Sequence, residues 1–146
     1  MLLIDVGADI EAYGLNDIKK PLITAAFNGD PDLVDLLLCR GAQVEAHDDT
    51  HDATALHWVV YGAHFWWQIH DQRPQVVHRL IHAGIDPNHV HPRWGSPLHL
   101  ASQFGQINLV KTLLSSGAHP DLKNAEGKTP KQLAEENKHE TVVKML

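Results

Sequence analysis

The chain has 146 residues, 43% of them hydrophobic, and carries a formal net charge of −6 when its 12 histidines are neutral. This acidic balance excludes nucleic acid as an expected partner, because proteins that bind the phosphate backbone usually present a basic face. No apolar run approaches the roughly 20 residues that span a bilayer, and Cys39 is the single cysteine, so we expect no membrane insertion, no internal disulfide and a cytoplasmic location.

A hexapeptide motif recurs four times along the chain. Its copies begin at Lys20, Thr54, Ser96 and Thr129, and their second residues stand 34, 42 and 33 positions apart. A tripeptide that begins with glycine runs in step with it, at Gly7, Gly41, Gly84 and Gly117, with spacings of 34, 43 and 33. Two independent markers with one period indicate that the chain is built from repeats.

Each copy of the motif is predicted to open a pair of helices. In residues 96–101 (SPLHLA), the hydroxyl of Ser96 suits an N-cap and Pro97 suits the first helical position. A second helix follows, with apolar residues at 109, 110, 113 and 114 on one stripe, and Gly117 suits its left-handed stop. Residues 33–41 and 76–84 repeat this second pattern. Each unit is therefore helix, turn, helix and a polar stretch.

A period near 33 with this motif resembles the ankyrin-repeat family, and the resemblance covers essentially the whole chain. It implies an all-α solenoid in which each polar stretch forms a β-turn or hairpin. In chain order we predict, within a single domain 1–146, an N-terminal half repeat at 1–19, three full repeats at 20–53, 54–95 and 96–128, and a C-terminal capping helix pair at 129–146. Lys131 replaces the leucine of the motif there, which is typical of a cap that faces water.

The N-terminal half repeat begins with the apolar residues 1–4, and the helix that should cover them is missing. End repeats of a solenoid normally present a polar outer face. We therefore expect either that the chain is a fragment with repeats missing upstream, or that self-association covers this end.

The repeat at 54–95 contains nine extra residues, near 63–71, between its two helices. The apolar series at 56, 59, 60, 63 and 67 keeps helical spacing, which predicts a first helix that extends to about His70. Gly62 lies within this helix at a cost of about 1 kcal/mol relative to Ala, and Pro74 would begin the second helix. Trp66 and Trp67 point about 100° apart on a helix, so we expect one to be buried and the other to be exposed to a partner.

The resemblance implies a protein–protein interaction module, which binds a partner protein or peptide through its concave face and hairpin tips. We expect the partner-binding residues at the positions that the family leaves free of core duty, together with the two tryptophans of the insertion. They are Phe27, Asn28, His47, Asp49, His51, Trp58, Tyr61, Trp66, Trp67, His89, His91, Arg93, Trp94, Leu100, Gln103 and Phe104. The set is rich in aromatic residues and arginine, which supply most of the binding energy in typical interfaces.

The histidines fall into three groups. His57 and His99 occupy the fourth place of the motif, where the family's histidine bonds to hairpin backbone. His78 and His82, four residues apart on a second helix, share its outward face and are expected to be solvated. His47, His51, His89 and His91 lie with aspartates in two successive hairpin tips, where imidazole and carboxylate could hold zinc or nickel. Tips accumulate polar residues in any case, so we predict no resident metal and no cofactor.

No catalytic signature is present. The chain has no Gly-x-Ser-x-Gly motif and no phosphate-binding glycine loop, and residues 139–143 lack the second histidine of a zinc-protease helix. We therefore expect that the protein is not an enzyme. The alternatives to a binding module are a recognition or positioning arm of a larger protein or effector and, less favoured, a metal-dependent function of the hairpin tips.

Overall fold

The computed structural model describes residues 20–48, 52–65 and 71–146. The predictions for the half repeat 1–19 and for Asp49, His51, Trp66 and Trp67 lie outside these residues. Within the described ranges the chain forms eight helices and no strand. The helices are α2 (Pro21–Asn28), α3 (Pro31–Cys39), α4 (Ala55–Phe65), α5 (Arg73–His82), α6 (Pro97–Gln103), α7 (Ile107–Ser115), α8 (Pro130–Glu136) and α9 (Glu140–Met145). The predicted all-α solenoid is confirmed.

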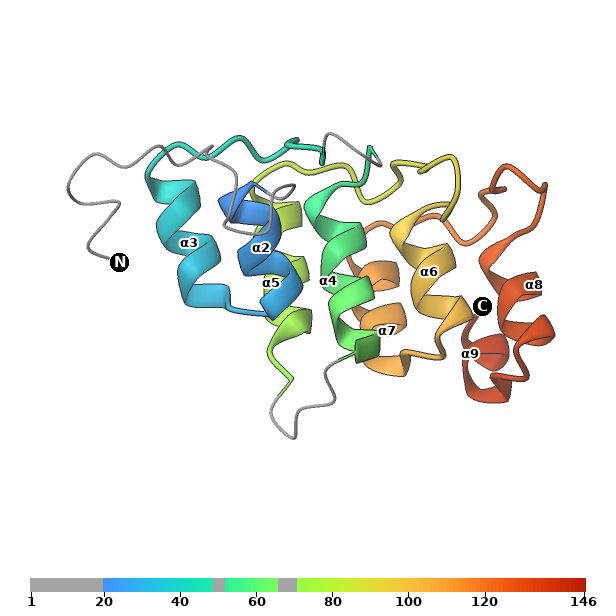
Figure 1. Ribbon diagram of the computed structural model, residues 1–146. Helices are drawn as coiled ribbons and strands as arrows, with labels where there is room; N and C mark the ends of the chain where they lie inside the picture. Colours follow the sequence, from blue (N-terminus) through green and yellow to red (C-terminus); the bar gives the residue numbers. More distant parts are fainter. Residues whose placement is uncertain (1–19, 49–51, 66–70) are drawn as a thin grey trace.

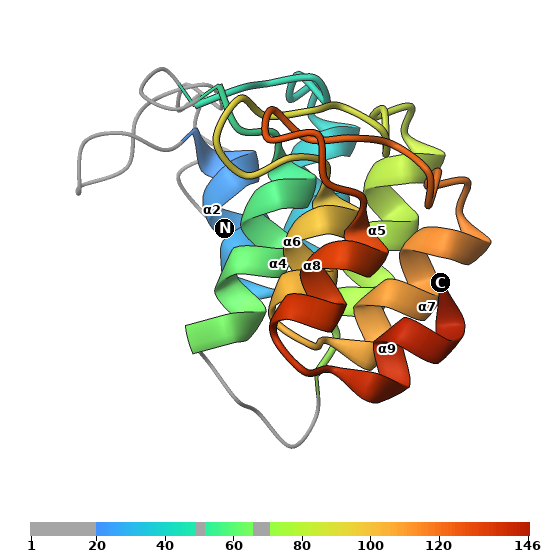
Figure 2. The ribbon, with the colours of Figure 1, turned by 90° about the vertical axis from the view of Figure 1, so that its right-hand side faces the viewer.

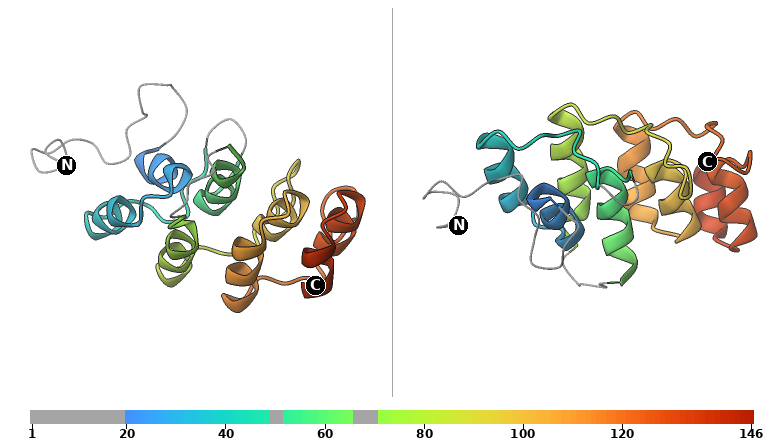
Figure 3. Two further views of the ribbon diagram at one scale, coloured as in Figure 1. Left: turned by 90° about the horizontal axis from the view of Figure 1, so that it is seen from below. Right: turned by 45° about the horizontal axis from the view of Figure 1, so that its top comes forward.

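The helices stand in two rows (Figures 1 and 3). The first row holds α2, α4, α6 and α8, and the second holds α3, α5, α7 and α9. Each helix packs against its partner in the other row and against its neighbours in its own row. The polar stretches that follow the second helices line up along one edge of both rows, as the end-on view in Figure 2 shows. Consecutive hairpins therefore lie next to one another. None of the described helices is long and apolar enough to cross a membrane.

The motif positions the helices as expected. Ser96 accepts a hydrogen bond from the backbone N–H of His99, and Thr129 accepts one from Gln132, so both form capping boxes. Prolines occupy the first turn of both helices. Leu22, Leu56 and Leu98, at the motif's third position, are fully buried between the rows, whereas Lys131 at the same place in the last unit is exposed. The outer side of α8 is therefore polar, as a cap requires.

The insertion lengthens α4, which has eleven residues where α2 has eight and α6 has seven. The predicted extension is confirmed as far as Phe65, and its remainder to His70 lies outside the described residues. α5 begins at Arg73, with Pro74 in its first turn. Glycine is required at position 62, because a Cβ built on it would lie 2.1 Å from the carbonyl oxygen of Phe27 in α2. Only glycine allows α4 to approach α2 this closely.

Candidate functional site

Aromatic rings gather on the first row of helices. We call this region the aromatic surface and define it by six partly or largely exposed residues from three successive repeats. They are Phe27 of α2; Tyr61, His64 and Phe65 of α4; Trp94 of the hairpin before α6; and Phe104 at the end of α6.

Tyr61 lies at the centre of the aromatic surface. Its ring stacks on Trp94, with centroids 5.4 Å apart and planes 9° apart, and it lies 4.9 Å from the Phe65 ring and 6.4 Å from the Phe104 ring. Residues 61, 64 and 65 are three and four positions apart on α4, so they share one side of the helix. The elongated α4 thereby brings rings from two repeats into contact.

Trp58 is buried beneath the aromatic surface. The prediction that Trp58 contacts a partner is therefore wrong. Trp58 is only 7% exposed, and its ring lies 6.1 Å from Phe27, 5.6 Å from Tyr61 and 5.5 Å from Trp94, edge-on in each case. The neighbouring rings cover it almost completely. Trp58 therefore positions the exposed rings and has little surface of its own to contribute.

Two further predicted residues are also buried. Leu100 is 3% exposed, because α6 stands between α4 and α8 in the first row. His91 is 3% exposed, and its Nδ1 accepts hydrogen bonds from the backbone N–H groups of Arg93 and Trp94, each at 3.0 Å. His91 therefore shapes the hairpin, and neither side chain is available to a partner.

The other described candidates are accessible. Asn28, Arg93 and Gln103 are exposed and polar, and they lie in or beside the elements that carry the aromatic surface. Phe65 is 57% exposed and was not among the predicted residues, nor was His64. The signal for both was present: they follow Tyr61 at i+4 and i+3 within the insertion.

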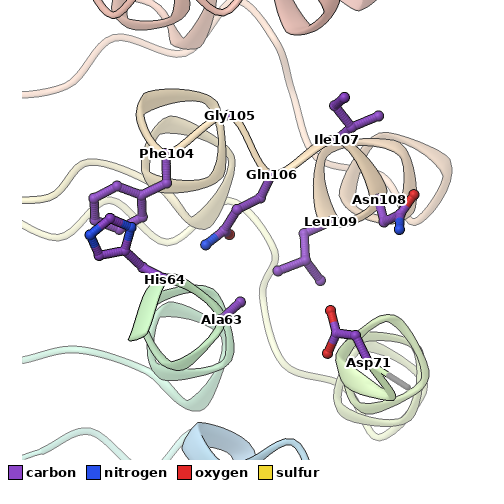
Figure 4. A pocket seen from close by; sticks show the side chains of 9 residues that line it. All are labelled: Ala63, His64, Asp71, Phe104, Gly105, Gln106, Ile107, Asn108 and Leu109. Atoms are coloured by element: carbon purple, nitrogen blue, oxygen red, sulfur yellow. The ribbon is translucent and has the colours of Figure 1, made fainter. Parts of the chain in front are cut away.

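An open pocket adjoins the aromatic surface between the end of α4, Asp71 just before α5, and the turn from α6 into α7 (Figure 4). His64 and Phe104 stack at one side of it, with centroids 4.1 Å apart and planes 15° apart. Asp71 and Leu109 point toward each other at the other side. The remaining lining residues are Ala63, Gly105, Gln106, Ile107 and Asn108. The Gln106 amide donates a hydrogen bond of 2.9 Å to the carbonyl of Val60, which ties this turn to α4.

His57 links its helix to the next hairpin, as predicted. Its Nδ1 accepts from the backbone N–H of Thr54 at 3.3 Å, so the proton of the neutral ring is on Nε2, which donates to the carbonyl of Gly95 at 2.9 Å. Burial lowers the pKa of His57 to about 3, the Gly95 hydrogen bond opposes this shift, and neighbouring histidines add to it. His57 is therefore neutral and fully bonded at neutral pH.

His99 repeats this arrangement one unit later. Its Nδ1 accepts from the backbone N–H of Ser96 at 3.1 Å, and Nε2 donates to the carbonyl of Lys128 at 3.0 Å. Burial lowers the pKa of His99 as well, against the hydrogen bond to Lys128, which raises it. The two motif histidines hold successive hairpins in place, which confirms their structural role.

The two hairpin tips lie close enough for their polar side chains to meet. The ring centroids of His47 and His89 are 4.8 Å apart, and the Asp52 carboxylate lies beside both rings. His78 and His82 are exposed on α5, as expected. Sequence spacing alone did not single out Asp52, because the residue that it joins across the hairpins is 37 positions away.

Family models match most of the chain. A model described as ankyrin repeats (3 copies) matches residues 65–146, and a model described as ankyrin repeat matches residues 20–49. The first match alone covers more than half of the chain.

Several curated proteins are similar to this chain over part of their length. Human transient receptor potential cation channel subfamily A member 1 is 31% identical over 176 aligned positions, which cover 99% of this chain and 16% of the channel. The mouse B-cell lymphoma 3 protein homolog is 30% identical over 134 residues, 92% of this chain and 20% of that protein. The ARF GTPase-activating protein Git of Drosophila melanogaster is 38% identical over 69 residues, 47% of this chain and 9% of that protein.

This chain spans no more than about a fifth of the length of these three relatives. The similarity therefore concerns a segment of each of them. Ankyrin repeats are in general protein–protein interaction modules and are typically non-enzymatic. With matching models over both parts of the chain, and with paired helices in two rows joined by hairpins, this protein belongs to the ankyrin-repeat family.

Proposed function

We propose that this protein binds a segment of a partner protein through the aromatic surface. The observation that carries the proposal is the contact among five accessible rings from two repeats, with the largely exposed Phe65 among them. The buried Trp58 connects these rings to Phe27 of a third repeat. Aromatic side chains offer a large contact area and lose little conformational entropy on binding. The exposed polar residues Asn28, Arg93 and Gln103 suit the rim of such an interface, where solvent-accessible polar groups are usual.

The packing beneath the rings supports this proposal. Tyr61 is stacked on Trp94 and His64 is stacked on Phe104, so these side chains are already held in one orientation. Ordering flexible side chains is one of the costs of association, and a preorganised surface avoids much of it. The occupant that fits is a segment with apolar or aromatic side chains, seated across α2, α4 and α6.

We also propose that the protein is located in the cytoplasm. Cys39 is a free and exposed thiol, which a reducing compartment preserves. That these repeats serve as a recognition or positioning arm of a larger protein or effector remains a prediction.

The test uses a partner identified by crosslinking and mass spectrometry, then purified for calorimetry. Phe65→Ala and Phe104→Ala should each weaken binding about 30-fold, which corresponds to a hot spot of about 2 kcal/mol. Lys111→Ala, at an exposed position of α7 in the second row, should leave the affinity unchanged and serves as the matched control. Phe65 and Phe104 are preferable to the buried Trp58, whose removal would disturb the fold.

Circular dichroism and thermal melting establish that each variant is folded. Retention of full affinity by folded Phe65→Ala and Phe104→Ala would refute the proposed surface. Loss of affinity in Lys111→Ala alone would place the interface on the second row.

A further inference from the structure

We propose that His47, Asp52 and His89 form a binding site for a divalent transition-metal ion, with zinc as the best-suited ion. The three residues come from two successive repeats, because His47 and Asp52 belong to the hairpin before α4 and His89 belongs to the hairpin before α6. One ligand atom from each lies within 4.8 Å of the others. The site is separate from the aromatic surface and does not depend on the proposed partner.

Even without a bound ion, the distances between the metal-ligating atoms are close to those in a zinc site. His47 Nδ1 lies 2.6 Å from Asp52 Oδ1, and Asp52 Oδ2 lies 3.9 Å from His89 Nε2. Ligands of a tetrahedral zinc ion, at about 2.1 Å from the metal, stand about 3.4 Å from one another. Both distances to the carboxylate lie within about 1 Å of that value, and the three ligand atoms lie within 4.8 Å of one another, so side-chain rotations would bring them onto one ion.

His89 offers a ring nitrogen to a metal ion beside the Asp52 carboxylate. Its Nε2 is shielded from solvent and has no hydrogen-bond partner among the described residues. A shielded ring nitrogen without a partner has a desolvation cost, which a bound metal would offset. The nearby His57 does not compete as a ligand, because Thr54 and Gly95 already occupy both of its ring nitrogens.

The donor set selects the class of ion. Two imidazole nitrogens and one carboxylate suit zinc, nickel or copper, whereas calcium and magnesium prefer oxygen ligands only. Three protein ligands leave one tetrahedral position, which water would fill. Metal binding at His47 Nδ1 requires the tautomer with the ring proton on Nε2, and the ion then replaces the hydrogen bond between Nδ1 and the Asp52 carboxylate. The bound ion would join two neighbouring hairpins and so fix one repeat against the next.

Calorimetry with zinc chloride and chelator-stripped protein tests the proposal. We expect one ion per chain with a Kd of about 1 µM, and no saturable heat with magnesium. Zinc at 100 times the Kd should also raise the midpoint of thermal unfolding by about 5–10 °C. The absence of saturable zinc binding below about 100 µM would overturn the proposal.

Two variants remove the site, and a third separates it from other histidines. His89→Gln and Asp52→Asn should each weaken zinc binding at least about tenfold. Asparagine suits position 52, because Asp52 has a φ of 57° and asparagine adopts this region readily, so the variant keeps the fold. His78→Gln with His82→Gln removes the exposed pair on α5 and should leave binding unchanged. Binding that persists in both site variants, or that disappears in the α5 double variant, would contradict the proposed ligands.

Discussion

Replacement of Gly62 by alanine gives a direct test of how closely α2 and α4 approach each other. Intrinsic helix propensity predicts that Gly62→Ala stabilises α4 by about 1 kcal/mol. The tertiary structure predicts the opposite. A Cβ at this position would lie 2.1 Å from the Phe27 carbonyl oxygen and 3.0 Å from its carbonyl carbon. Both atoms belong to the backbone and cannot rotate away.

The size of the effect follows from this geometry. An ordinary carbon–oxygen contact is about 3.3 Å, so α2 must move away from α4 by about 1 Å. Overpacking of this kind typically costs about 1–3 kcal/mol, and here the cost lies at or above the upper end because α2 must move as a unit. The same Phe27 carbonyl accepts a hydrogen bond of 3.3 Å from the buried Arg73, which the shift would weaken. After the gain in helix propensity, we expect a net loss of about 2–3 kcal/mol.

Urea and thermal unfolding measure this loss. The midpoint of thermal unfolding should fall by about 4–12 °C in Gly62→Ala. Gly127→Ala is the control: it has a φ of 75° and no atom within 4 Å of an added Cβ, so it carries only the cost of backbone strain, about 1–2 kcal/mol. A Gly62→Ala variant as stable as the wild type, or more stable, would refute the close approach of the two helices.

The remaining predictions concern His99 and Phe65. His99→Ala should destabilise the protein by about 2–3 kcal/mol in urea unfolding, because it removes the acceptor of the Ser96 backbone N–H and leaves the Lys128 carbonyl without its donor. His99→Gln should cost less, since Gln132 already caps Thr129 in the same way, at 2.9 Å; equal losses in the two variants would contradict this view. The lowered pKa of His99 means that the unfolded chain takes up a proton first, so the stability advantage of the wild type over His99→Gln should shrink as the pH falls below about 6.5, and an advantage that is constant between pH 7.5 and 5 would argue against it. Phe65→Ala should change the free energy of unfolding by no more than about 0.5 kcal/mol, because the side chain is largely exposed, and a larger loss in thermal melts would show that Phe65 belongs to the core.

Much of the fold could be predicted because its signals are local. The caps at Ser96 and Thr129 act over three residues. The glycines that follow α3, α5 and α7 adopt a positive φ within one residue, as the φ of 95° at Gly117 shows. Helical spacing after Thr54 also predicted the long α4 as far as Phe65. The bonds of His57 and His99 to the following hairpins were expected from the family resemblance, since sequence spacing alone does not bring those groups together.

Less of the candidate site could be predicted, because burial depends on the neighbouring repeats. Trp58 and Leu100 occupy positions that the family leaves free, yet both are covered here. The rings of Phe27, Tyr61 and Trp94 surround Trp58, and α4 and α8 flank Leu100. An exposed position in one repeat becomes a buried one when its neighbours happen to carry large side chains.

The sequence by itself determined the repeat period, the capped starts of α6 and α8, and the polar character of the last helix pair, because the signals for these features lie within a few residues of each other. Only the tertiary structure decided that Gly62 must remain glycine, that Trp58 lies beneath an aromatic surface, and that Asp52 meets His47 and His89. Gly62 and Phe27 are 35 positions apart in the chain, about the spacing of 34 between their two repeats. Contacts of this kind depend on how closely successive repeats stack, and no local pattern encodes that distance.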